Sequence, residues 1–326
     1  MPWNYSIIQA IKSRKNSIGS NISSISRDRG VQLVNNDEII HSKIVKFGIY
    51  PHAQSCEPAI TGKEMRQNGL RRLRKYVNVW YSIKNEGENM EYPRAKHYSD
   101  ADWMKKIMGP NPLKLEEELL TCHHIKENGL VCDLGSGQGL TSVFLVKEYG
   151  FRVVAADLWS DPDENRSFFR SCGLSDDVIT PVKADALALP FEKESFDAVI
   201  STDSYNYFGR DKTYLNRCLY PYIRHGGYVY ICVPGMHRDL HENLPAELLL
   251  SWTPEQMDYM HDTTYWKDIV SASMFEVLEV SEMESNEEVW ADWLRQENPY
   301  AIGDRKSMNA GAGKYLNFIK IVLKKP

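Results

Sequence analysis

Asp133 and three alternate glycines carry the clearest chemical signal in the sequence. An apolar run ends at Asp133, and the chain then turns through Gly135, Gly137 and Gly139. Glycines between a strand and a helix let backbone N–H groups approach a ligand without interference from Cβ atoms. Leu140 stands where a G-x-G-x-x-G turn has its third glycine, and an acid before the turn would repel a pyrophosphate. The spacing therefore predicts a nucleotide-type cofactor with a cationic amino-acid end.

This segment resembles the first motif of class I S-adenosylmethionine-dependent methyltransferases, whose pattern D-x-G-x-G-x-G is matched from Asp133 to Gly139. The resemblance covers residues 92–326, is closest to small-molecule methyltransferases, and implies S-adenosylmethionine as the cofactor. Asp157, an acid at the end of the second predicted strand, can accept hydrogen bonds from both ribose hydroxyls. By resemblance, Asp185 accepts from the adenine amino group. The expected cofactor-binding residues are Asp133, Gly135, Ser136, Gly137, Gly139, Asp157, Leu158, Asp185, Ala186 and Ser201.

The elements that position these residues are strands alternating with helices. Such alternation requires crossover connections and favours a mainly parallel sheet covered on both faces. The resemblance implies a Rossmann-like, doubly wound α/β sheet of seven strands in the order 3-2-1-4-5-7-6, with the last strand antiparallel. Ligands are then expected at the carboxyl ends of strands 1 and 4. Strand-like runs occur at 131–134, 151–158, 182–186, 196–201, 226–234, 274–280 and 315–323.

Residues after the fourth predicted strand are the candidates for the acceptor side. Asp203 could hold an amine or accept a proton, or it could cap the following helix. Tyr205 and Tyr207 could line the pocket, and His261 could act as a base at neutral pH or have a structural role. Transfer from a sulfonium is a direct in-line displacement, so a base is required only when the acceptor arrives protonated. Asp203, Tyr205 and His261 are the expected catalytic residues.

Two segments are expected to cover the site. In residues 92–115, Tyr98, Trp103 and Met108 either line the cofactor site, as the resemblance implies, or pack in the core. Residues 237–273 form a long aromatic insertion, which the resemblance implies is an acceptor lid. A later polar, glycine-containing stretch at 290–313 either closes the pocket or is an ordinary loop.

Composition predicts a soluble globular enzyme. The chain has 326 residues, 42% of them hydrophobic and 25% charged. No apolar run approaches the ~20 residues of a membrane-spanning helix, so no membrane association is expected. Six cysteines show no C-x-x-C pair and no metal-ligand spacing, so the sequence predicts no metal and a cytoplasmic location.

Residues 1–90 differ in charge from the remainder. They carry 14 Lys and Arg against seven Asp and Glu, whereas residues 91–326 carry 25 against 37. We expect a basic, partly flexible extension of unknown role, followed by one methyltransferase domain over 91–326. A helix predicted at 62–83 has a basic cluster, for which a solvated face is a simpler explanation than nucleic-acid contact. The cluster comprises Arg71, Arg72, Arg74 and Lys75.

The resulting functional prediction is methyl transfer from S-adenosylmethionine to a nitrogen, oxygen or sulfur of a small molecule. A nucleic-acid or protein methyltransferase that uses the basic extension is the first alternative. The Asn-Pro-Pro-Tyr tetrapeptide associated with many DNA and glutamine-amide methyltransferases is missing, which disfavours nucleic acid. A non-enzymatic protein that binds S-adenosylmethionine is the second alternative. The sequence leaves the acceptor and the oligomeric state open.

Overall fold

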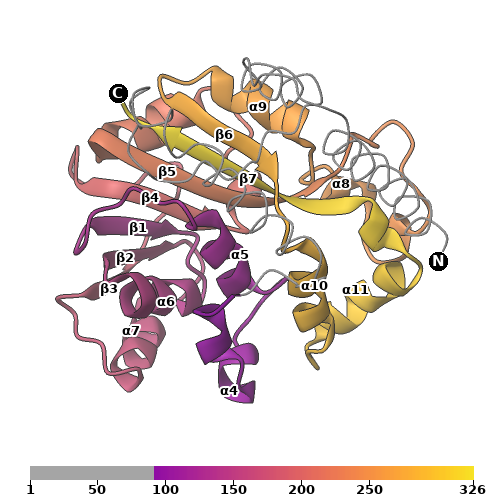
Figure 1. The fold of residues 1–326 in the computed structure, drawn as a ribbon, viewed down its shortest axis with the longest axis horizontal. Helices are drawn as coiled ribbons and strands as arrows, with labels where there is room; N and C mark the ends of the chain where they lie inside the picture. Colours follow the sequence, from indigo (N-terminus) through magenta and orange to yellow (C-terminus); the bar gives the residue numbers. More distant parts are fainter. Residues whose placement is uncertain (1–91) are drawn as a thin grey trace, which may run out of the picture. The chain divides into compact units, whose positions relative to one another are not determined.

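The computed structural model describes residues 92–326, and a seven-stranded sheet forms the centre of this part of the chain (Figure 1). Its strand order is β3-β2-β1-β4-β5-β7-β6. The first five strands pair in parallel, and β7 pairs antiparallel with β5 and β6. The predicted order and the antiparallel last strand are confirmed. The strands are β1 (Leu130–Leu134), β2 (Arg152–Asp157), β3 (Ile179–Lys183), β4 (Phe196–Thr202), β5 (Ile223–Met236), β6 (Glu276–Glu282) and β7 (Leu316–Lys324).

Successive strand residues point to opposite faces and enter two separate hydrophobic cores. In β1, Val131 belongs to one core and Cys132 to the other, and Ala198 and Val199 of β4 divide in the same way. These four residues are at most 1% exposed. Strands buried on both faces are apolar at consecutive positions, which is why the sequence marks them so clearly. Cys132 and Cys232 are small core residues, as predicted.

Helices cover both faces of the sheet. On one face α6 packs against β2 and α7 against β3, whereas α9 packs against β6 within the second core. The α-helices are α4 (Ala101–Met104), α5 (Pro112–Leu119), α6 (Leu140–Tyr149), α7 (Pro162–Ser171), α8 (Pro254–Met257), α9 (Thr263–Ser271), α10 (Asn286–Leu294) and α11 (Pro299–Asn309). The 3-10 helices are η1 (Ala95–Tyr98), η2 (Tyr205–Tyr207), η4 (Tyr220–Tyr222), η5 (Leu248–Leu250) and η6 (Ala312–Lys314), and η3 (Leu215–Leu219) is a short π-helix.

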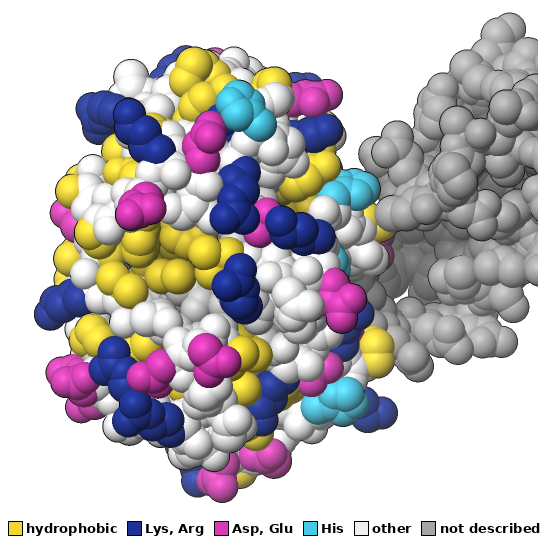
Figure 2. Space-filling view, turned by 90° about the vertical axis from the view of Figure 1, so that its left-hand side faces the viewer, with side chains coloured by type: hydrophobic (Ala, Val, Ile, Leu, Met, Phe, Trp, Pro, Cys, Tyr) yellow, Lys and Arg dark blue, Asp and Glu magenta, His cyan; other side chains and the backbone are white. Residues whose placement is uncertain are grey.

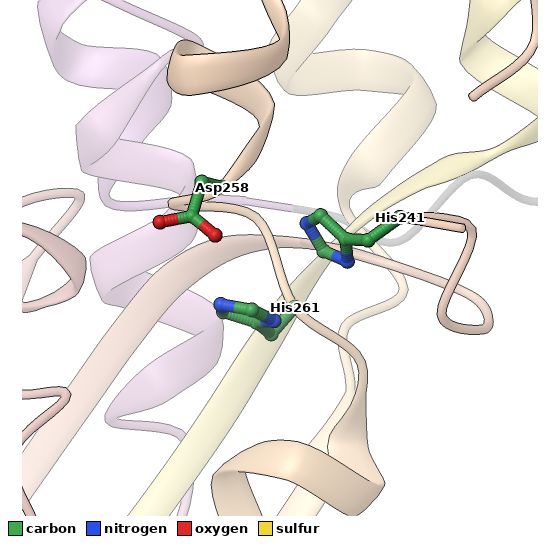
Figure 3. A group of neighbouring side chains, drawn as sticks. All are labelled: His241, Asp258 and His261. Carbon is green, nitrogen blue, oxygen red and sulfur yellow. The ribbon is translucent and has the colours of Figure 1, made fainter. Parts of the chain in front are cut away.

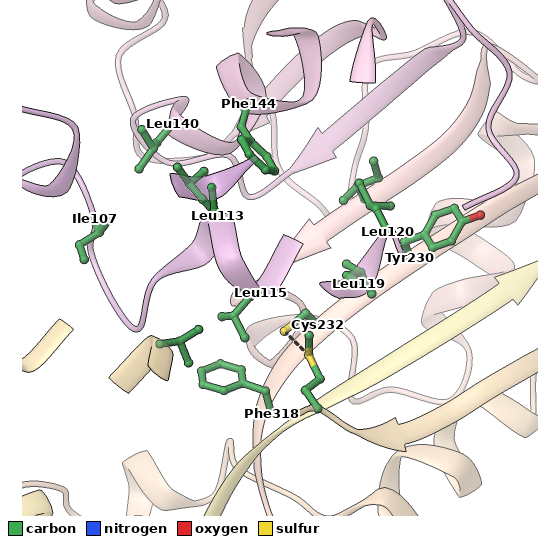
Figure 4. Packing of buried hydrophobic residues seen from close by; sticks show 14 of the residues in the cluster. Ile107, Leu113, Leu115, Leu119, Leu120, Leu140, Phe144, Tyr230, Cys232 and Phe318 are labelled. Atoms are coloured by element: carbon green, nitrogen blue, oxygen red, sulfur yellow. Dashed lines mark hydrogen bonds between the residues drawn. The ribbon is translucent and has the colours of Figure 1, made fainter. Parts of the chain in front are cut away.

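The helix α5 leads into β1 and anchors the first core (Figure 4). It begins at Asn111, whose side chain accepts hydrogen bonds from the next backbone N–H groups, and Pro112 occupies its first turn. The leucines that predicted this helix all lie in the core with Phe318 and Cys232. They are Leu113, Leu115, Leu119 and Leu120, each at most 2% exposed.

The connection between β6 and β7 contains two helices, α10 and α11, rather than the ordinary loop that was one of two expectations for this stretch. In α10, Val289, Trp290 and Trp293 are buried along one face. The side chain of Asn298 accepts from the Tyr300 N–H at 2.9 Å and starts α11. The glycines and polar residues of this stretch favoured a loop, and the buried apolar face of α10 was not recognised.

The expectations for residues 1–90 fall outside the described part of the chain. They include the extension itself, the helix at 62–83 and the basic cluster from Arg71 to Lys75. Within residues 92–326, no helix is long and apolar enough to cross a membrane.

Candidate cofactor and acceptor site

The turn after β1 requires glycine because all three of its glycines have positive φ. Gly135, Gly137 and Gly139 have φ of 81°, 52° and 78°, a region that costs other residues about 1–2 kcal/mol each. A Cβ on Gly135 would overlap the side chain of Ser204, and one on Gly139 would overlap the ring of Phe169. A Cβ on Gly137 would meet no atom within 4 Å among the described residues. The space beside Gly137 is therefore open to a ligand.

Asp133 lies beneath this turn and fastens it to α6. Its Oδ2 accepts hydrogen bonds from Thr141 Oγ1 at 2.7 Å and from Ser142 Oγ at 2.6 Å. Burial raises the pKa of Asp133 to about 6, although the two hydroxyl bonds oppose this effect. The roles of Thr141 and Ser142 were not expected from the sequence, because their partner is eight or nine residues away. A direct contact of Asp133 with a cofactor stays a prediction.

Asp157, at the end of β2, is held by three backbone N–H groups. Oδ2 accepts from Gly137 at 2.9 Å, and Oδ1 accepts from Trp159 and Ser160 at 2.8 Å each. A carboxylate offers about four acceptor positions, so about one stays free, on Oδ2. Asn165 of α7 also donates to the Gly137 carbonyl at 2.9 Å. The open side of Gly137 and the free acceptor of Asp157 thus lie next to each other.

Ser136 and Ser201 have different surroundings. The Ser136 hydroxyl is buried and has no hydrogen-bond partner among the described residues. Ser201 Oγ donates to the Leu134 carbonyl at 2.9 Å and lies 2.8 Å from Ser204 Oγ, so it joins β4 to β1. Buried polar groups in native proteins normally have partners. The orphaned Ser136 hydroxyl therefore fits a ligand that supplies one, as a nucleoside cofactor does.

The other expected cofactor residues lie in two neighbouring loops at the same edge of the sheet. Leu158 directly follows Asp157 and is 42% exposed. Asp185 is exposed, and its Oδ1 accepts from the Leu187 N–H at 2.8 Å. Ala186 follows it in this loop, which joins β2 through a hydrogen bond from the Ala184 N–H to the Asp157 carbonyl. Contacts of these residues with adenine or ribose stay predictions.

Asp203 directly follows β4 and has no hydrogen-bond donor or cationic partner for its carboxyl within residues 92–326. Its φ is 56°, a conformation that Asp tolerates better than most residues. A Cβ on Gly109 would lie 2.7 Å from Asp203 Oδ2, so Gly109 leaves room for the carboxyl. Burial, with repulsion from Asp304, raises the pKa of Asp203 to about 7. The helix-cap interpretation is wrong, since Ser204 is the N-cap of η2 and no side chain caps that turn.

Asp304 of α11 is a second acid in this region. Its Oδ1 accepts from Trp252 Nε1 at 2.9 Å, and its Oδ2 accepts from Trp293 Nε1 at 2.8 Å. Burial raises the pKa of Asp304, and the indole bonds oppose this rise. In the described part of the chain no Lys, Arg or His forms an ion pair with Asp203 or Asp304. This role of Asp304 could not be predicted from the sequence, because Trp252 lies 52 residues away from it.

Glu116 of α5 is also buried near the carboxyl end of the sheet. Its Oε1 lies 3.5 Å from Thr202 Oγ1, and its Oε2 is buried without a partner among the described residues. Burial and the charge of Asp133 raise the pKa of Glu116 well above its usual range. Its neighbours Glu117 and Glu118 instead accept backbone N–H groups of the η1 region and of the loop before α10.

Tyr205 and Tyr207 occupy different environments. Tyr205 is fully buried in the second core, where its ring packs against Tyr214 and Trp266. Tyr207 is 59% exposed and packs against Tyr259 of the insertion, with ring centroids 5.2 Å apart. This placement favours a packing role for Tyr205 and leaves Asp203 as the reactive candidate of this loop.

His261 lies in the insertion and faces His241 (Figure 3). It stacks on Tyr265 with ring centroids 3.5 Å apart and is 8% exposed. Burial, with repulsion from His241, lowers the pKa of His261 to about 4, so it is neutral and weakly basic at pH 7. His241 Nδ1 lies 2.6 Å from Asp239 Oδ1, and its Nε2 lies 3.0 Å from the Met257 carbonyl. Burial opposes these bonds, but they raise the pKa of His241.

The aromatic residues of the first expected lid divide between core and surface. Tyr98 is buried against Trp103 and Phe144, so core packing is the correct interpretation for it. Trp103 borders a cavity of about 600 Å³ between α4, α6 and α7. Met108 is 57% exposed. The contact of Gly109 with Asp203 places the end of this segment beside the acceptor side.

Residues 132–231, from β1 to β5, match the family model described as a methyltransferase domain. Together with the strand order, this match identifies the fold as that of a class I methyltransferase domain. A methyltransferase domain on this fold indicates an S-adenosylmethionine-dependent methyltransferase enzyme. None of the curated proteins matches the sequence.

Solved structures share the fold at low sequence identity. Phosphoethanolamine N-methyltransferase 2 of Haemonchus contortus is 20% identical over 73% of this chain and 58% of its own, with a TM-score of 0.54. Geranyl diphosphate C-methyltransferase of Streptomyces coelicolor A3(2) is 14% identical over 66% and 77%, with a TM-score of 0.53. The [4+2]-cyclase SpnF is 14% identical over 65% and 81%, with a TM-score of 0.50. These likenesses establish the fold but not the acceptor.

Proposed function

We propose that the protein transfers the methyl group of S-adenosylmethionine to a small molecule bound beside Asp203. The observation that carries this proposal is a half-buried carboxyl directly after β4 that has no cationic partner in the described part of the chain. In open α/β sheets ligands bind at the carboxyl ends of the central strands. Ser204, the next residue, lies against Gly135 of the glycine turn. Asp203 is therefore close to the turn that would hold the methyl donor.

The residues around the glycine turn fit the donor. Ser136 supplies an unpartnered hydroxyl, Gly137 an open side and Asp157 a free acceptor position. Leu158 and the loop of Asp185 and Ala186 would border the adenosine end. S-adenosylmethionine supplies a methyl group on a positively charged sulfur, which is already an electrophile.

Asp203 would take the proton of the nucleophile. A carboxyl whose pKa is about 7 is present in both forms at neutral pH, which suits a general base. Among nitrogen, oxygen and sulfur nucleophiles, a protonated amine matches the surroundings best. Neither Asp203 nor Asp304 has a cationic partner among the described residues, and an ammonium group would supply one. Binding the amine and removing its proton are then done by the same carboxyl.

Two observations support a small molecule over a nucleic acid. Two structural neighbours bear names with small substrates, phosphoethanolamine and geranyl diphosphate. On the face shown in Figure 2, Lys and Arg side chains are interspersed with Asp and Glu rather than gathered into one basic area. A nucleic-acid interface is usually a continuous basic surface.

The test combines a labelled cofactor with a variant of Asp203. The full-length protein is incubated with methyl-labelled S-adenosylmethionine and a pool of small metabolites, and labelled products are identified by mass spectrometry. We expect label in an amine. Asp203→Asn should bind the cofactor within about twofold of the wild type by calorimetry and lose about 10²–10⁴-fold in transfer. The control, Glu192→Gln, changes an exposed acid in the loop before β4 and should transfer normally.

Several outcomes would contradict the proposal. Full transfer by Asp203→Asn would make Asp203 a structural residue. Label that appears in RNA, DNA or protein of a lysate, and in no metabolite, would favour the alternative acceptors. Tight cofactor binding without transfer to any pool would favour a non-enzymatic protein.

A further inference from the structure

We propose that His241, Asp258 and His261 form a binding site for a divalent transition-metal ion of the zinc type. The three residues belong to the connection between β5 and β6, and each offers one ligand atom within 4.8 Å of the others. Figure 3 shows their side chains directed toward one another. The proposal is independent of the acceptor chemistry at Asp203.

Each of the three side chains has an atom available for coordination. His261 makes no ring-nitrogen hydrogen bond within residues 92–326. Asp258 uses Oδ2 in its bond to Arg210 and leaves Oδ1 without a partner in the same part of the chain. His241 Nε2 lies 3.0 Å from the Met257 carbonyl. A metal ion would replace the proton on Nε2: the N–H bond breaks, the nitrogen–metal bond forms, and the proton passes to solvent.

A second set of contacts orients each ligand, as in established metal sites. His241 Nδ1 lies 2.6 Å from Asp239 Oδ1, a carboxylate–histidine pair that directs Nε2 to the ion. Arg210 holds Asp258 through Oδ2 at 2.7 Å and through the backbone carbonyl at 2.8 Å. His261 is fixed by stacking on Tyr265. The charge of Arg210 opposes a cation, but Asp239 and Asp258 offset it.

The distances require only a small contraction. Bonds of about 2.0–2.2 Å to a tetrahedral ion place its ligands about 3.4 Å apart. The candidate ligand atoms here lie within 4.8 Å of one another, and side-chain rotation can bring them to the shorter separation. The Met257 carbonyl, next to His241 Nε2, could complete the coordination, or water could. The result is a site with three side-chain ligands and a fourth position for the Met257 carbonyl or a water molecule.

The donor set selects the ion. Two imidazoles and one carboxylate suit Zn²⁺ or Co²⁺, whereas Mg²⁺ and Ca²⁺ prefer oxygen ligands. The sequence predicted no metal because its cysteines lack metal spacing, but this cluster contains no cysteine. The ion would join residues 239–241 to residues 258–261 and so brace the insertion that contacts Tyr207.

The experiment uses untagged full-length protein treated with a chelator and then titrated with Co²⁺. We expect one equivalent to bind, with the visible absorption of a low-symmetry cobalt site, and Zn²⁺ to displace it. His261→Ala and His241→Ala should each weaken binding at least tenfold. Asp239→Asn, which keeps all three ligands, should weaken it about 10–100-fold. His237→Ala is the matched control, because His237 pairs with Glu282 outside the cluster and should bind as the wild type does.

Circular dichroism identifies variants that fail to fold. If His241→Ala or His261→Ala fails to fold, Asp239→Asn provides the test. Absence of stoichiometric binding to the wild type would overturn the proposal. Equal affinity in the wild type, His261→Ala and Asp239→Asn would also overturn it, because the metal would then bind elsewhere.

Discussion

The Oδ2 atom of Asp157 accepts a hydrogen bond from the backbone N–H of Gly137 at 2.9 Å. This bond joins the end of β2 to the middle of the glycine turn, so the two parts of the expected cofactor site form one unit. The second glycine of the turn and the acid expected to bind the ribose are thus positioned by each other.

Asp157→Ala should weaken S-adenosylmethionine binding by about 1–3 kcal/mol, the range for loss of hydrogen bonds to a charged group. Calorimetry measures this change. Asp163→Asn, an exposed acid in the first turn of α7, is the control and should bind normally. Unchanged affinity of Asp157→Ala would remove Asp157 from the site.

The glycines allow a comparison of stability. Gly135→Ala should destabilise the protein by about 2–3 kcal/mol, because a positive φ is combined with overlap onto Ser204. Gly137→Ala should cost about 1–2 kcal/mol, because it has the positive φ without the overlap. Urea unfolding measures both. Equal losses of unfolding free energy in the two variants would show that the overlap with Ser204 is relieved without a loss of stability.

Methyl transfer should depend on pH through Asp203. Its pKa is raised to about 7, and the carboxylate is the proposed base, so the rate should rise from pH 6 to pH 8 and then level off. Asp304→Asn removes a negative charge that contributes to this raised pKa, so the midpoint should move to lower pH. Glu297→Gln, an exposed acid before α11, should leave the midpoint in place. A pH profile of the transfer rate decides between these results.

Asp203 should also make the folded state less stable as pH rises. Its folded pKa lies above its usual value of 3.8, so the folded state binds more protons between about pH 4 and pH 7. The charged carboxyl is then half-buried and has no cationic partner within residues 92–326. Asp203→Asn should therefore be more stable than the wild type by about 1–3 kcal/mol at pH 8 and nearly equal to it at pH 4. Equal stabilities of the wild type and Asp203→Asn at both pH values would mean that solvent reaches the carboxyl.

The sequence predicted the sheet because its signals are local. Runs such as Val131–Leu134 are apolar at consecutive positions, and the glycine turn marks the first strand-to-helix connection. The expected strands near 274 and 315 begin within two residues of β6 and β7. In contrast, the helices α10 and α11 were not predicted, because polar residues interrupt their apolar faces.

The sequence by itself thus determined the fold class, the methyl donor and the loop that follows β4. Only the tertiary structure decided the surroundings of the reactive groups. Asp304 accepts a hydrogen bond from Trp252, which is 52 residues away in the sequence, and His241 contacts the carbonyl of Met257, which is 16 residues away. The pKa of Asp203 depends on burial by segments far away in the chain. Spacing along the chain reveals local turns and strands, but the desolvation and charge that set chemical reactivity arise from contacts that folding creates.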